Sequence, residues 1–433
     1  MTPPFVVLGS SHVRCSLRAS SGRRALVLGL ALLLGALAAP LGGASDWPQW
    51  RGPTRDGRVD GAPWPDRLRD GRLARRWTVE LGPSYAGPIV AGDRVFTVET
   101  RDEEEEIVRA FDRTTGETLW RTAWEGAMDV PFFAARNGSW VRSTPAFDDG
   151  ALYVAGMRDV LVRLDAETGE EDWRVDFPAR DGTPLPTFGF VSSPLVVGDH
   201  VLVQAGAALV KLDKATGETV WRSLDDGGGM MGSAFSSPIL ASPGGVSQFV
   251  VQTRTHLAGV APEDGGVLWR REIPSFRGMN ILTPTVIGDA VFTATYGGRS
   301  RRLDLAPSDA GVTVRQAWEG RTQGNMTSPV VVDGHAYLLT RGNRFTCIDL
   351  TDGEVRWTSG PTGDDYWSLV RQGDRILALA NTGILRLVAA SPDAYDVLDE
   401  VRVSEADTWA HLAVVDGALF VRDRFGLSAF DWR

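Results

Sequence analysis

Short apolar runs separated by two-residue polar turns fill the chain from about residue 73 onward. In one unit Leu195-Val-Val is followed by Gly198-Asp199 and then by Val201-Leu-Val. Gly-Asp and Asp-Gly pairs tolerate the positive φ of tight hairpin turns, so such a unit predicts two antiparallel strands. Thr-Gly-Glu forms a second turn, as at Gly116 and Gly169. The pattern therefore predicts repeated units of four short strands.

The spacing of the units predicts how many there are. A Ser-Pro or Thr-Pro pair precedes the first strand of several units, and its prolines (145, 194, 238, 284 and 329) lie 49, 44, 46 and 45 residues apart. This is the length of a four-stranded propeller blade. Residues 73–433 divide into eight such units of about 45 residues. We predict an all-β fold, an eight-bladed β-propeller of four-stranded blades.

The two ends of the repeat region complement each other. Ala429-Phe430-Asp431 repeats Ala110-Phe111-Asp112 and is followed by only two residues, so the last blade lacks a fourth strand. Arg76-Trp77-Thr78, within residues 73–81, matches Arg356-Trp357-Thr358 and can supply it. We predict that this N-terminal strand completes the last blade and leaves no open seam.

A tryptophan recurs at one position of the repeat. Ala110-Phe-Asp-Arg-Thr-Thr-Gly116-Glu-Thr-Leu-Trp120 has close copies ending at Trp173 and Trp221, and a degenerate copy ends at Trp318. A large ring at a fixed place on each fourth strand can cover the seam to the next blade. We predict this structural docking role for Trp77, Trp120, Trp173, Trp221, Trp269 and Trp357.

The N-terminus has the pattern of an export signal. Arg23-Arg24 precede the apolar run Ala25–Ala39, which is followed by Gly42-Gly43-Ala44. The run is short for a membrane span. We predict a signal peptide over 1–44 and a chain exported to the periplasm or cell envelope, with no membrane span after cleavage; an uncleaved anchor is the alternative. Residues 45–72 are then a lead-in segment that packs against the propeller as a strap, and 73–433 form the propeller.

Charge and cysteine content narrow the function classes. The net charge is −10, which argues against nucleic-acid binding because that requires clustered positive charge. Cys347 is the only cysteine left after cleavage, so no intrachain disulfide can form and a buried thiol is expected. We expect a monomer.

The tryptophan motif resembles that of a known repeat family. Ala110, Asp112, Thr115, Gly116 and Trp120 match the tryptophan-docking motif of quinoprotein dehydrogenases, the pyrroloquinoline-quinone-like β-propeller repeat family. The family also includes the non-enzymatic propeller lipoprotein of the outer-membrane β-barrel assembly machine. For the dehydrogenases the resemblance implies bound pyrroloquinoline quinone, a calcium held by Glu, Asn and Asp, and an adjacent cysteine pair. The chain lacks the cysteine pair, and the calcium set cannot be placed, so the sequence favours a protein without cofactor or catalytic residues.

Other motifs carry little chemistry. His200 and His335 follow hairpin turns, and His256 and His411 have no partner at metal-ligand spacing, so no metal site is predicted. Residues 227–232 match Gly-x-Gly-x-x-Gly but join two strands, whereas a dinucleotide site needs a following helix. The acidic run at 102–106 is expected to be a solvated hairpin tip.

The loops between blades have an unusual composition. They share one face with the turns between the second and third strands, and they are rich in aromatic, methionine and arginine residues, which are enriched in interface cores. We predict that this loop face binds through Phe133, Arg136, Asn137, Trp140, Phe188, Met231, Arg277, Asn280, Gln323, Asn325, Tyr366, Trp367 and Trp409. The alternative is that these side chains plug the central channel or cover the blades.

The function that these patterns favour is a non-catalytic binding or scaffold propeller of the bacterial cell envelope with a protein or peptide partner. A quinone-cofactor-dependent oxidoreductase and a carbohydrate-binding propeller remain as alternatives, since aromatic platforms also suit sugars.

Overall fold

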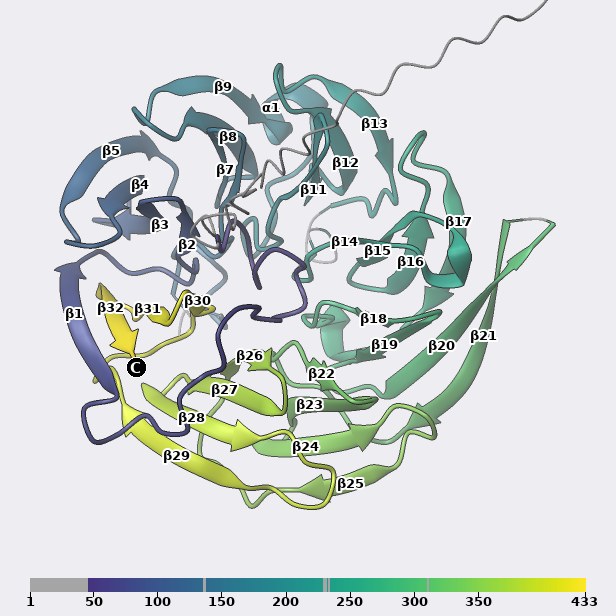
Figure 1. The fold of residues 1–433 in the computed structure, drawn as a ribbon. Coiled ribbons are helices and arrows are strands. Elements are labelled where there is room, and N and C mark those ends of the chain that lie inside the picture. The colour runs from purple at the N-terminus through teal and green to yellow at the C-terminus, as the bar shows by residue number, and fades with distance from the viewer. Residues whose placement is uncertain (1–45, 135–137, 229–231, 233, 310) are drawn as a thin grey trace, which may run out of the picture. The chain divides into compact units, whose positions relative to one another are not determined.

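The computed structural model describes residues 46–433 except 135–137, 229–231, 233 and 310. Eight four-stranded antiparallel sheets stand around a common centre (Figure 1). The predicted all-β, eight-bladed propeller is therefore confirmed. The proposed signal peptide lies outside the described residues. Within the described part of the chain, no helix combines the length and hydropathy needed to cross a membrane.

Seven blades are built from four consecutive strands each. Blade 1 consists of β2 (Ile89–Ala91), β3 (Arg94–Arg101), β4 (Glu105–Asp112) and β5 (Thr118–Glu125), and blade 2 of β6 (Ala146–Asp148), β7 (Ala151–Gly156), β8 (Val160–Asp165) and β9 (Glu171–Asp176). Blade 3 consists of β10 (Leu195–Val197), β11 (His200–Ala205), β12 (Ala208–Asp213) and β13 (Thr219–Ser223), and blade 4 of β14 (Ile239–Ala241), β15 (Gln248–Gln252), β16 (His256–Val260) and β17 (Val267–Glu272). Blade 5 consists of β18 (Thr285–Ile287), β19 (Ala290–Ala294), β20 (Ser300–Ser308) and β21 (Gly311–Gly320), and blade 6 of β22 (Val330–Val332), β23 (His335–Thr340), β24 (Arg344–Asp349) and β25 (Val355–Thr358). Blade 7 consists of β26 (Trp367–Gln372), β27 (Arg375–Ala380), β28 (Ile384–Ala389) and β29 (Val397–Arg402). Within the described residues the short helices are α1 (Phe177–Asp181), η3 (Pro243–Gly245) and η4 (Phe276–Gly278).

Blade 8 joins the two ends of the propeller. It consists of β30 (Ala413–Val415), β31 (Ala418–Arg422) and β32 (Gly426–Trp432), and β1 (Leu73–Glu80) pairs antiparallel with β32. Trp77 stands opposite Ala429 in this pairing. The predicted closure by an N-terminal strand is therefore confirmed.

Most fourth-strand tryptophans pack on a glycine of the following blade. The Trp120 indole Nε1 donates to the Ala166 carbonyl at 3.1 Å, and a Cβ added to Gly169 (φ +77°) would lie 2.5 Å from the Trp120 ring. Trp77, Trp173, Trp221 and Trp318 make the same pair of contacts with the blade that follows each of them. The positive φ and the close ring together explain why glycine stands at this turn.

Two tryptophans vary this arrangement. Trp357 donates to the Ser391 carbonyl at 2.8 Å, in a blade that has no glycine at the turn. Trp269 donates instead to Gln248 Oε1 at 2.5 Å within its own blade 4. The next blade replaces the Thr-Gly turn by the long hairpin β20–β21, which protrudes from the ring (Figure 1). Trp269 thus lacks the hydrogen bond and the glycine contact to the next blade, but it is buried in an apolar cluster that includes Val291, Leu303 and Leu305 of that blade.

The Ser-Pro and Thr-Pro pairs form a second connection, around the central channel. In five successive seams the backbone N–H of one blade donates to the hydroxyl of the equivalent residue in the next blade, at 2.9–3.2 Å. We call these residues the inner ring; in order they are Gly87, Thr144, Ser193, Ser237, Thr283 and Ser328. Ser368 of blade 7 accepts from Leu412 N of blade 8 at 3.0 Å. The hydroxyl of the motif therefore links neighbouring blades.

The lead-in segment crosses the face of the Gly-Asp turns. Trp47 pairs with Val90 of blade 1, and Val59 N donates to the Arg371 carbonyl of blade 7 at 2.8 Å. In Figure 1 this dark purple segment passes over the centre of the ring. Arg51 and Arg55 project from it and are buried.

These two arginines bind the inner ends of the blades. Arg55 Nη2 and Nη1 donate to the Ser193 and Pro194 carbonyls at 3.0 and 2.6 Å, and Arg51 Nη2 donates to the Pro329 carbonyl. Burial lowers the pKa of Arg55 to about 9 and that of Arg51 to about 10. The segment therefore fills one end of the channel with two guanidinium groups held by main-chain carbonyls.

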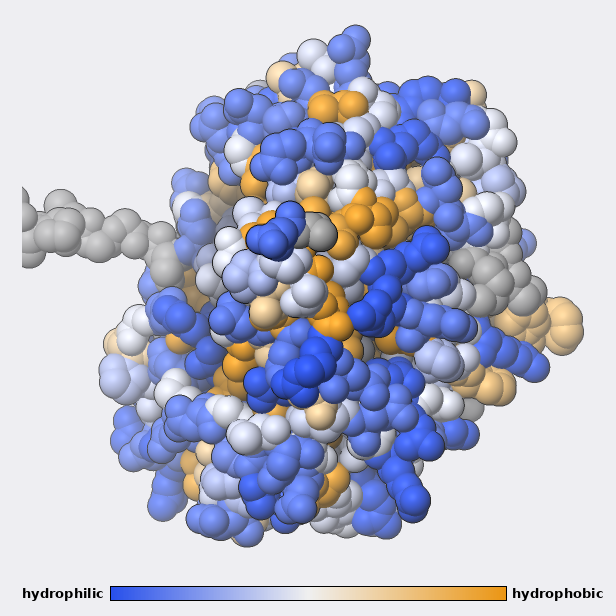
Figure 2. Space-filling model, turned by 90° about the vertical axis from the view of Figure 1, so that its right-hand side faces the viewer, coloured by the Kyte–Doolittle hydropathy of each residue, from blue (hydrophilic) through white to orange (hydrophobic). Residues whose placement is uncertain are grey.

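The outer side of the ring is mostly hydrophilic. The view of Figure 2 shows apolar side chains there in short bands between larger hydrophilic areas. This agrees with the burial pattern of the fourth strands, such as β5, in which exposed positions alternate with partly buried ones. The apolar surface is buried between the blades, in clusters that span neighbouring sheets.

We expect Gly169→Ala to destabilise the protein much more than Gly150→Ala. Both glycines have φ +77°, but a Cβ at Gly150 meets nothing within 4 Å, whereas one at Gly169 collides with the Trp120 ring. Backbone strain alone costs about 1–2 kcal/mol, and the collision adds about 1–3 kcal/mol. Urea unfolding measures both variants, and equal losses of stability would show that the indole–glycine contact adds nothing.

Candidate functional site

Three neighbouring cavities form a depression on the loop face, which we call the bowl. Their volumes are about 190, 520 and 680 Å³, and Met326 lines all three. Arg142, Tyr85 and Phe133 are each shared by two of them. The loops from blade to blade supply most of these residues, so the bowl lies above the inner ring.

Three phenylalanine rings, Phe133, Phe188 and Phe235, form one wall of the bowl, and Phe132 continues the row into solvent. Ring centroids lie 5.6 Å apart for Phe132–Phe133, 6.3 Å for Phe133–Phe188 and 5.5 Å for Phe188–Phe235. Phe132 is 91% exposed, whereas Phe188 and Phe235 are partly buried. The Arg254 guanidinium lies 4.4 Å from the Phe235 ring centroid and 5.4 Å from that of Phe188. The row of rings therefore extends from solvent to the Arg254 guanidinium, which makes cation–π contacts with two of them.

Tyrosine and tryptophan rings form the opposite wall. Tyr366 and Trp409 stack at 5.5 Å, and Tyr85 lies 5.8 Å from Trp409 and 5.4 Å from Trp140. The Arg142 guanidinium lies 5.3 Å from the Tyr85 ring. Burial raises the pKa of Tyr366 to about 12 and also raises that of Tyr85. Both phenols therefore keep their protons and can donate hydrogen bonds.

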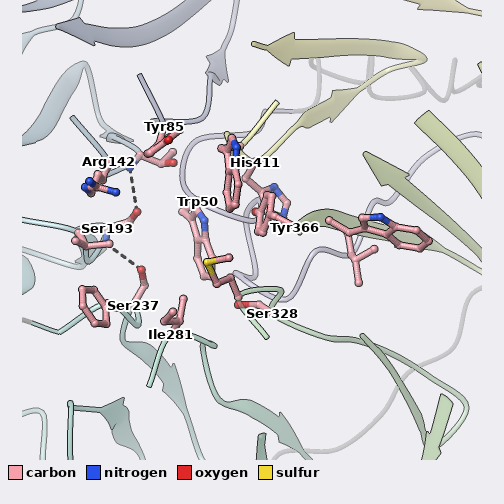
Figure 3. A pocket seen from close by; sticks show the side chains of 16 residues that line it. Trp50, Tyr85, Arg142, Ser193, Ser237, Ile281, Ser328, Tyr366 and His411 are labelled. Atoms are coloured by element: carbon pink, nitrogen blue, oxygen red, sulfur yellow. Dashed lines mark hydrogen bonds between the residues drawn. The ribbon is translucent and has the colours of Figure 1, made fainter. Parts of the chain in front are cut away.

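The floor of the bowl belongs to the lead-in segment. Trp50 stands in the middle of the smallest of the three cavities, between Ser193 and Ser237 on one side and Tyr366 and His411 on the other (Figure 3). The Trp50 and His411 rings meet edge to face at 5.9 Å. Burial, together with the charge of Arg51, lowers the pKa of His411 to about 3, so the imidazole is neutral. Sequence reasoning placed neither residue on the binding face: Trp50 was expected only in the lead-in strap, and His411 was considered only as a metal ligand and rejected.

The charge of the bowl is uneven. Arg142, Arg254 and Arg277 line the phenylalanine side. Asp407 lies on the other side and pairs with Arg424 at 2.6 Å. Burial lowers the pKa values of Arg142 and Arg254, which shows that both charges are partly desolvated. The phenylalanine side therefore suits a ligand with an apolar body and an acidic group.

The structure brings many of the predicted loop-face residues together. Six of them are among the lining residues of the bowl: Phe133, Phe188, Arg277, Tyr366, Trp367 and Trp409. Trp140 packs behind Tyr85 in the same wall. Gln323 lines a separate groove. Arg136, Asn137 and Met231 lie outside the described residues.

Three of the predicted residues make hydrogen bonds that brace the loops; Asn280 and Asn325 line none of the three cavities, whereas Trp367 lines the smallest. The buried Asn280 Nδ2 donates to the carbonyls of Thr253, Arg254 and Ile273 at 2.9–3.3 Å. Trp367 is fully buried and donates to Asp364 Oδ2 at 2.8 Å. Asn325 donates to the Asp365 carbonyl at 3.0 Å. Loop composition does not tell which side chains turn inward.

Two buried acids connect blades near this face. Glu106 accepts from Trp124 Nε1 at 2.9 Å and from Met157 N of blade 2 at 2.7 Å. Asp159 of blade 2 accepts from Gly206 N of blade 3 at 2.7 Å. Burial raises the pKa of each to about 7. The expectation of a fully solvated acidic tip is therefore wrong at Glu106.

Comparisons with known proteins agree on the repeat type. Residues 104–359 match the family model described as outer membrane protein assembly factor BamB. A polyvinylalcohol dehydrogenase of Sphingopyxis sp. is 32% identical over 42% of this chain and 29% of its own. BamB of Yersinia pestis is 26% identical over 53% of this chain and 58% of its own. The chain thus spans less than two thirds of either relative.

Solved structures extend the likeness to the whole fold. BamB from Moraxella catarrhalis aligns with 83% of this chain and 98% of its own, with a TM-score of 0.61 and 15% identity. The quinohemoprotein alcohol dehydrogenase from Comamonas testosteroni aligns with 89% of this chain and 80% of its own, with a TM-score of 0.57 and 15% identity. At this identity the likeness concerns the fold alone.

We expect Asp159→Asn to stabilise the protein at pH 8 and to flatten its pH dependence. Burial, together with the nearby carboxylates of Asp226, Asp176 and Asp181, raises the pKa of Asp159 from 3.8 to about 7. Stability from this group is therefore greatest below pH 4 and is lost as the pH rises to about 7, by roughly 2–4 kcal/mol. Asparagine keeps the acceptor for Gly206 and tolerates the φ of +62°.

Thermal unfolding between pH 4 and pH 8 measures this effect. The control is Asp199→Asn, which removes an exposed carboxylate. If the Asp159→Asn variant kept the pH dependence of the parent protein, ionisation of Asp159 would not lower the stability of the folded state.

Proposed function

The chain belongs to the family of the outer membrane protein assembly factor BamB, whose model covers residues 104–359, and on this basis we propose that it is a non-catalytic scaffold of the bacterial cell envelope. Its partner in this proposal is a protein or peptide segment that seats in the bowl. The relatives from Yersinia pestis and Nitrosomonas eutropha are named as outer membrane protein assembly factors, which supports a role in that process.

The observation that carries the proposal is the group of exposed phenylalanines beside a cavity. Phe132, Phe133 and Phe276 are 91%, 51% and 50% exposed, and the last two line the 680 Å³ cavity. Contiguous exposed apolar surface on a soluble protein is typical of an interaction site. Aromatic and arginine side chains around a pocket are the residue types that dominate binding energy in protein interfaces.

A quinone-dependent oxidoreductase is the second candidate, because one relative is named as a dehydrogenase. The residues of the bowl do not fit a calcium-held quinone. Trp50 stands in the smallest of the three cavities, which has about 190 Å³ of free volume. Asp407 is already paired with Arg424. Within the described residues, no three His, Cys, Asp or Glu side chains converge as metal ligands. These observations favour the scaffold.

We expect the double substitution Phe132→Ser/Phe133→Ser to impair function without unfolding the protein. Loss of two anchoring rings weakens the partner complex by about 2–4 kcal/mol, which is roughly 30- to 1,000-fold in affinity. The abundance of outer-membrane β-barrel proteins, in cells whose own copy of the gene is deleted, measures the effect. Leu119→Ser is the matched control, because Leu119 is 45% exposed on the outer strand β5.

Full complementation by the double variant would place the partner elsewhere on the surface. Dye-linked alcohol oxidation, with added pyrroloquinoline quinone and calcium, separates the two candidate functions. We expect no turnover above the reaction without protein. Turnover that requires the added quinone would replace the scaffold by the oxidoreductase.

A further inference from the structure

A groove at the loop-face end of blade 6 has a chemistry different from that of the bowl, and we propose that it binds a phosphate monoester on a sugar or lipid headgroup. Its volume is about 500 Å³, and it shares no lining residue with the bowl. Arg321, Arg341 and Arg344 line it, together with threonine hydroxyls and Gln323. The proposal is independent of the scaffold function.

The three arginines have no ion-pair partner among the residues that the structure describes. Among the described residues no carboxylate oxygen lies within 4.0 Å of any of their guanidinium nitrogens, although neighbouring arginines are paired: Arg299 and Arg301 share Glu319, and Arg356 pairs with Asp349. The whole chain has 55 acidic and 45 basic residues. Three arginines without an ion pair around one groove are therefore unexpected in a chain with more acidic than basic residues. An anion is the ligand that would compensate their charge.

Neutral groups hold two of these arginines in place. Arg341 Nη1 donates to Gln323 Oε1 at 2.9 Å, and its guanidinium lies 5.3 Å from the Tyr296 ring. Arg344 Nη1 donates to the Ser359 carbonyl at 2.8 Å. Each contact occupies one N–H group of a guanidinium that has five. The remaining donors form the planar fork that matches a phosphate group.

A row of threonines extends the groove beyond the size of a bare ion. The Thr340 and Thr346 hydroxyls lie 3.0 Å apart, and those of Thr346 and Thr358 lie 3.4 Å apart, across β23, β24 and β25. Hydroxyls can both donate and accept, so they suit the oxygens of a sugar or ester. The volume falls within the range of small-molecule sites. A phosphorylated sugar or a phosphate-bearing headgroup satisfies both parts of the groove.

Titration calorimetry of the full chain with inorganic phosphate and with glucose monophosphate tests the site. We expect the sugar phosphate to bind more tightly than phosphate alone, and Arg341→Gln/Arg344→Gln to weaken its binding at least tenfold. Arg299→Gln is the matched control, because Arg299 belongs to an ion pair outside the groove. An unchanged melting temperature shows that the double variant is folded.

Vesicles of phosphatidylcholine with and without phosphatidic acid separate the two sources of the phosphate. Arginine-dependent binding to phosphatidic acid without binding of the sugar phosphate identifies a lipid headgroup, and the reverse identifies a soluble ligand. Both results support the site. Absence of binding to all probes overturns the proposal, and so does binding that the double variant retains in full.

Discussion

The contact between a tryptophan ring and a glycine of the next blade is the interaction on which this propeller depends. A blade of four short strands cannot bury its faces alone, so its stability comes from its neighbours. One indole buries on the order of 150–250 Å² at each seam. The ring can approach so closely only because the facing residue has no Cβ and a positive φ, as at Gly169. The same turn offers a carbonyl to the indole N–H, as Ala166 does for Trp120, so the contact is also directional.

The inner ring and the lead-in segment complete this closure at the centre. Hydroxyl groups of the Ser-Pro and Thr-Pro pairs accept hydrogen bonds from backbone N–H groups of the preceding blades. Arg51 and Arg55 then bind carbonyls at the inner ends of the blades. Burial of the two cations lowers the pKa of both guanidinium groups, and the Asp56 carboxylate offsets this effect only at Arg51. Their effect is to close one end of the channel, so that the bowl opens only on the loop face.

Function on such a scaffold resides in the loops, because the blades are occupied with packing against one another. The bowl and the blade 6 groove both lie on the loop face, yet their chemistry differs. The bowl has aromatic walls and the floor residue Trp50. The groove has arginines and threonines and no aromatic ring among its lining residues. A rigid ring can therefore present an apolar segment and a phosphate-bearing group with separate surfaces.

The sequence by itself determined the blade number, the closure by residues 73–80 and most of the tryptophan positions. These properties follow from local turn chemistry and from a period that repeats along the chain, and both can be read without knowing distant contacts. Trp318 shows the limit of that approach, because its copy of the motif is degenerate while its docking contact is intact.

Only the tertiary structure decided which loop side chains face solvent and which brace the fold. Trp367 and Trp409 both line the smallest cavity of the bowl, but Trp367 is fully buried and donates to Asp364, whereas Trp409 is partly buried and stacks on Tyr366. Arg51 enters the channel, Glu106 becomes a buried acceptor, and Arg321 joins arginines of a different turn. Each outcome depends on residues far away in the sequence, because irregular loops have no period that specifies which side turns inward.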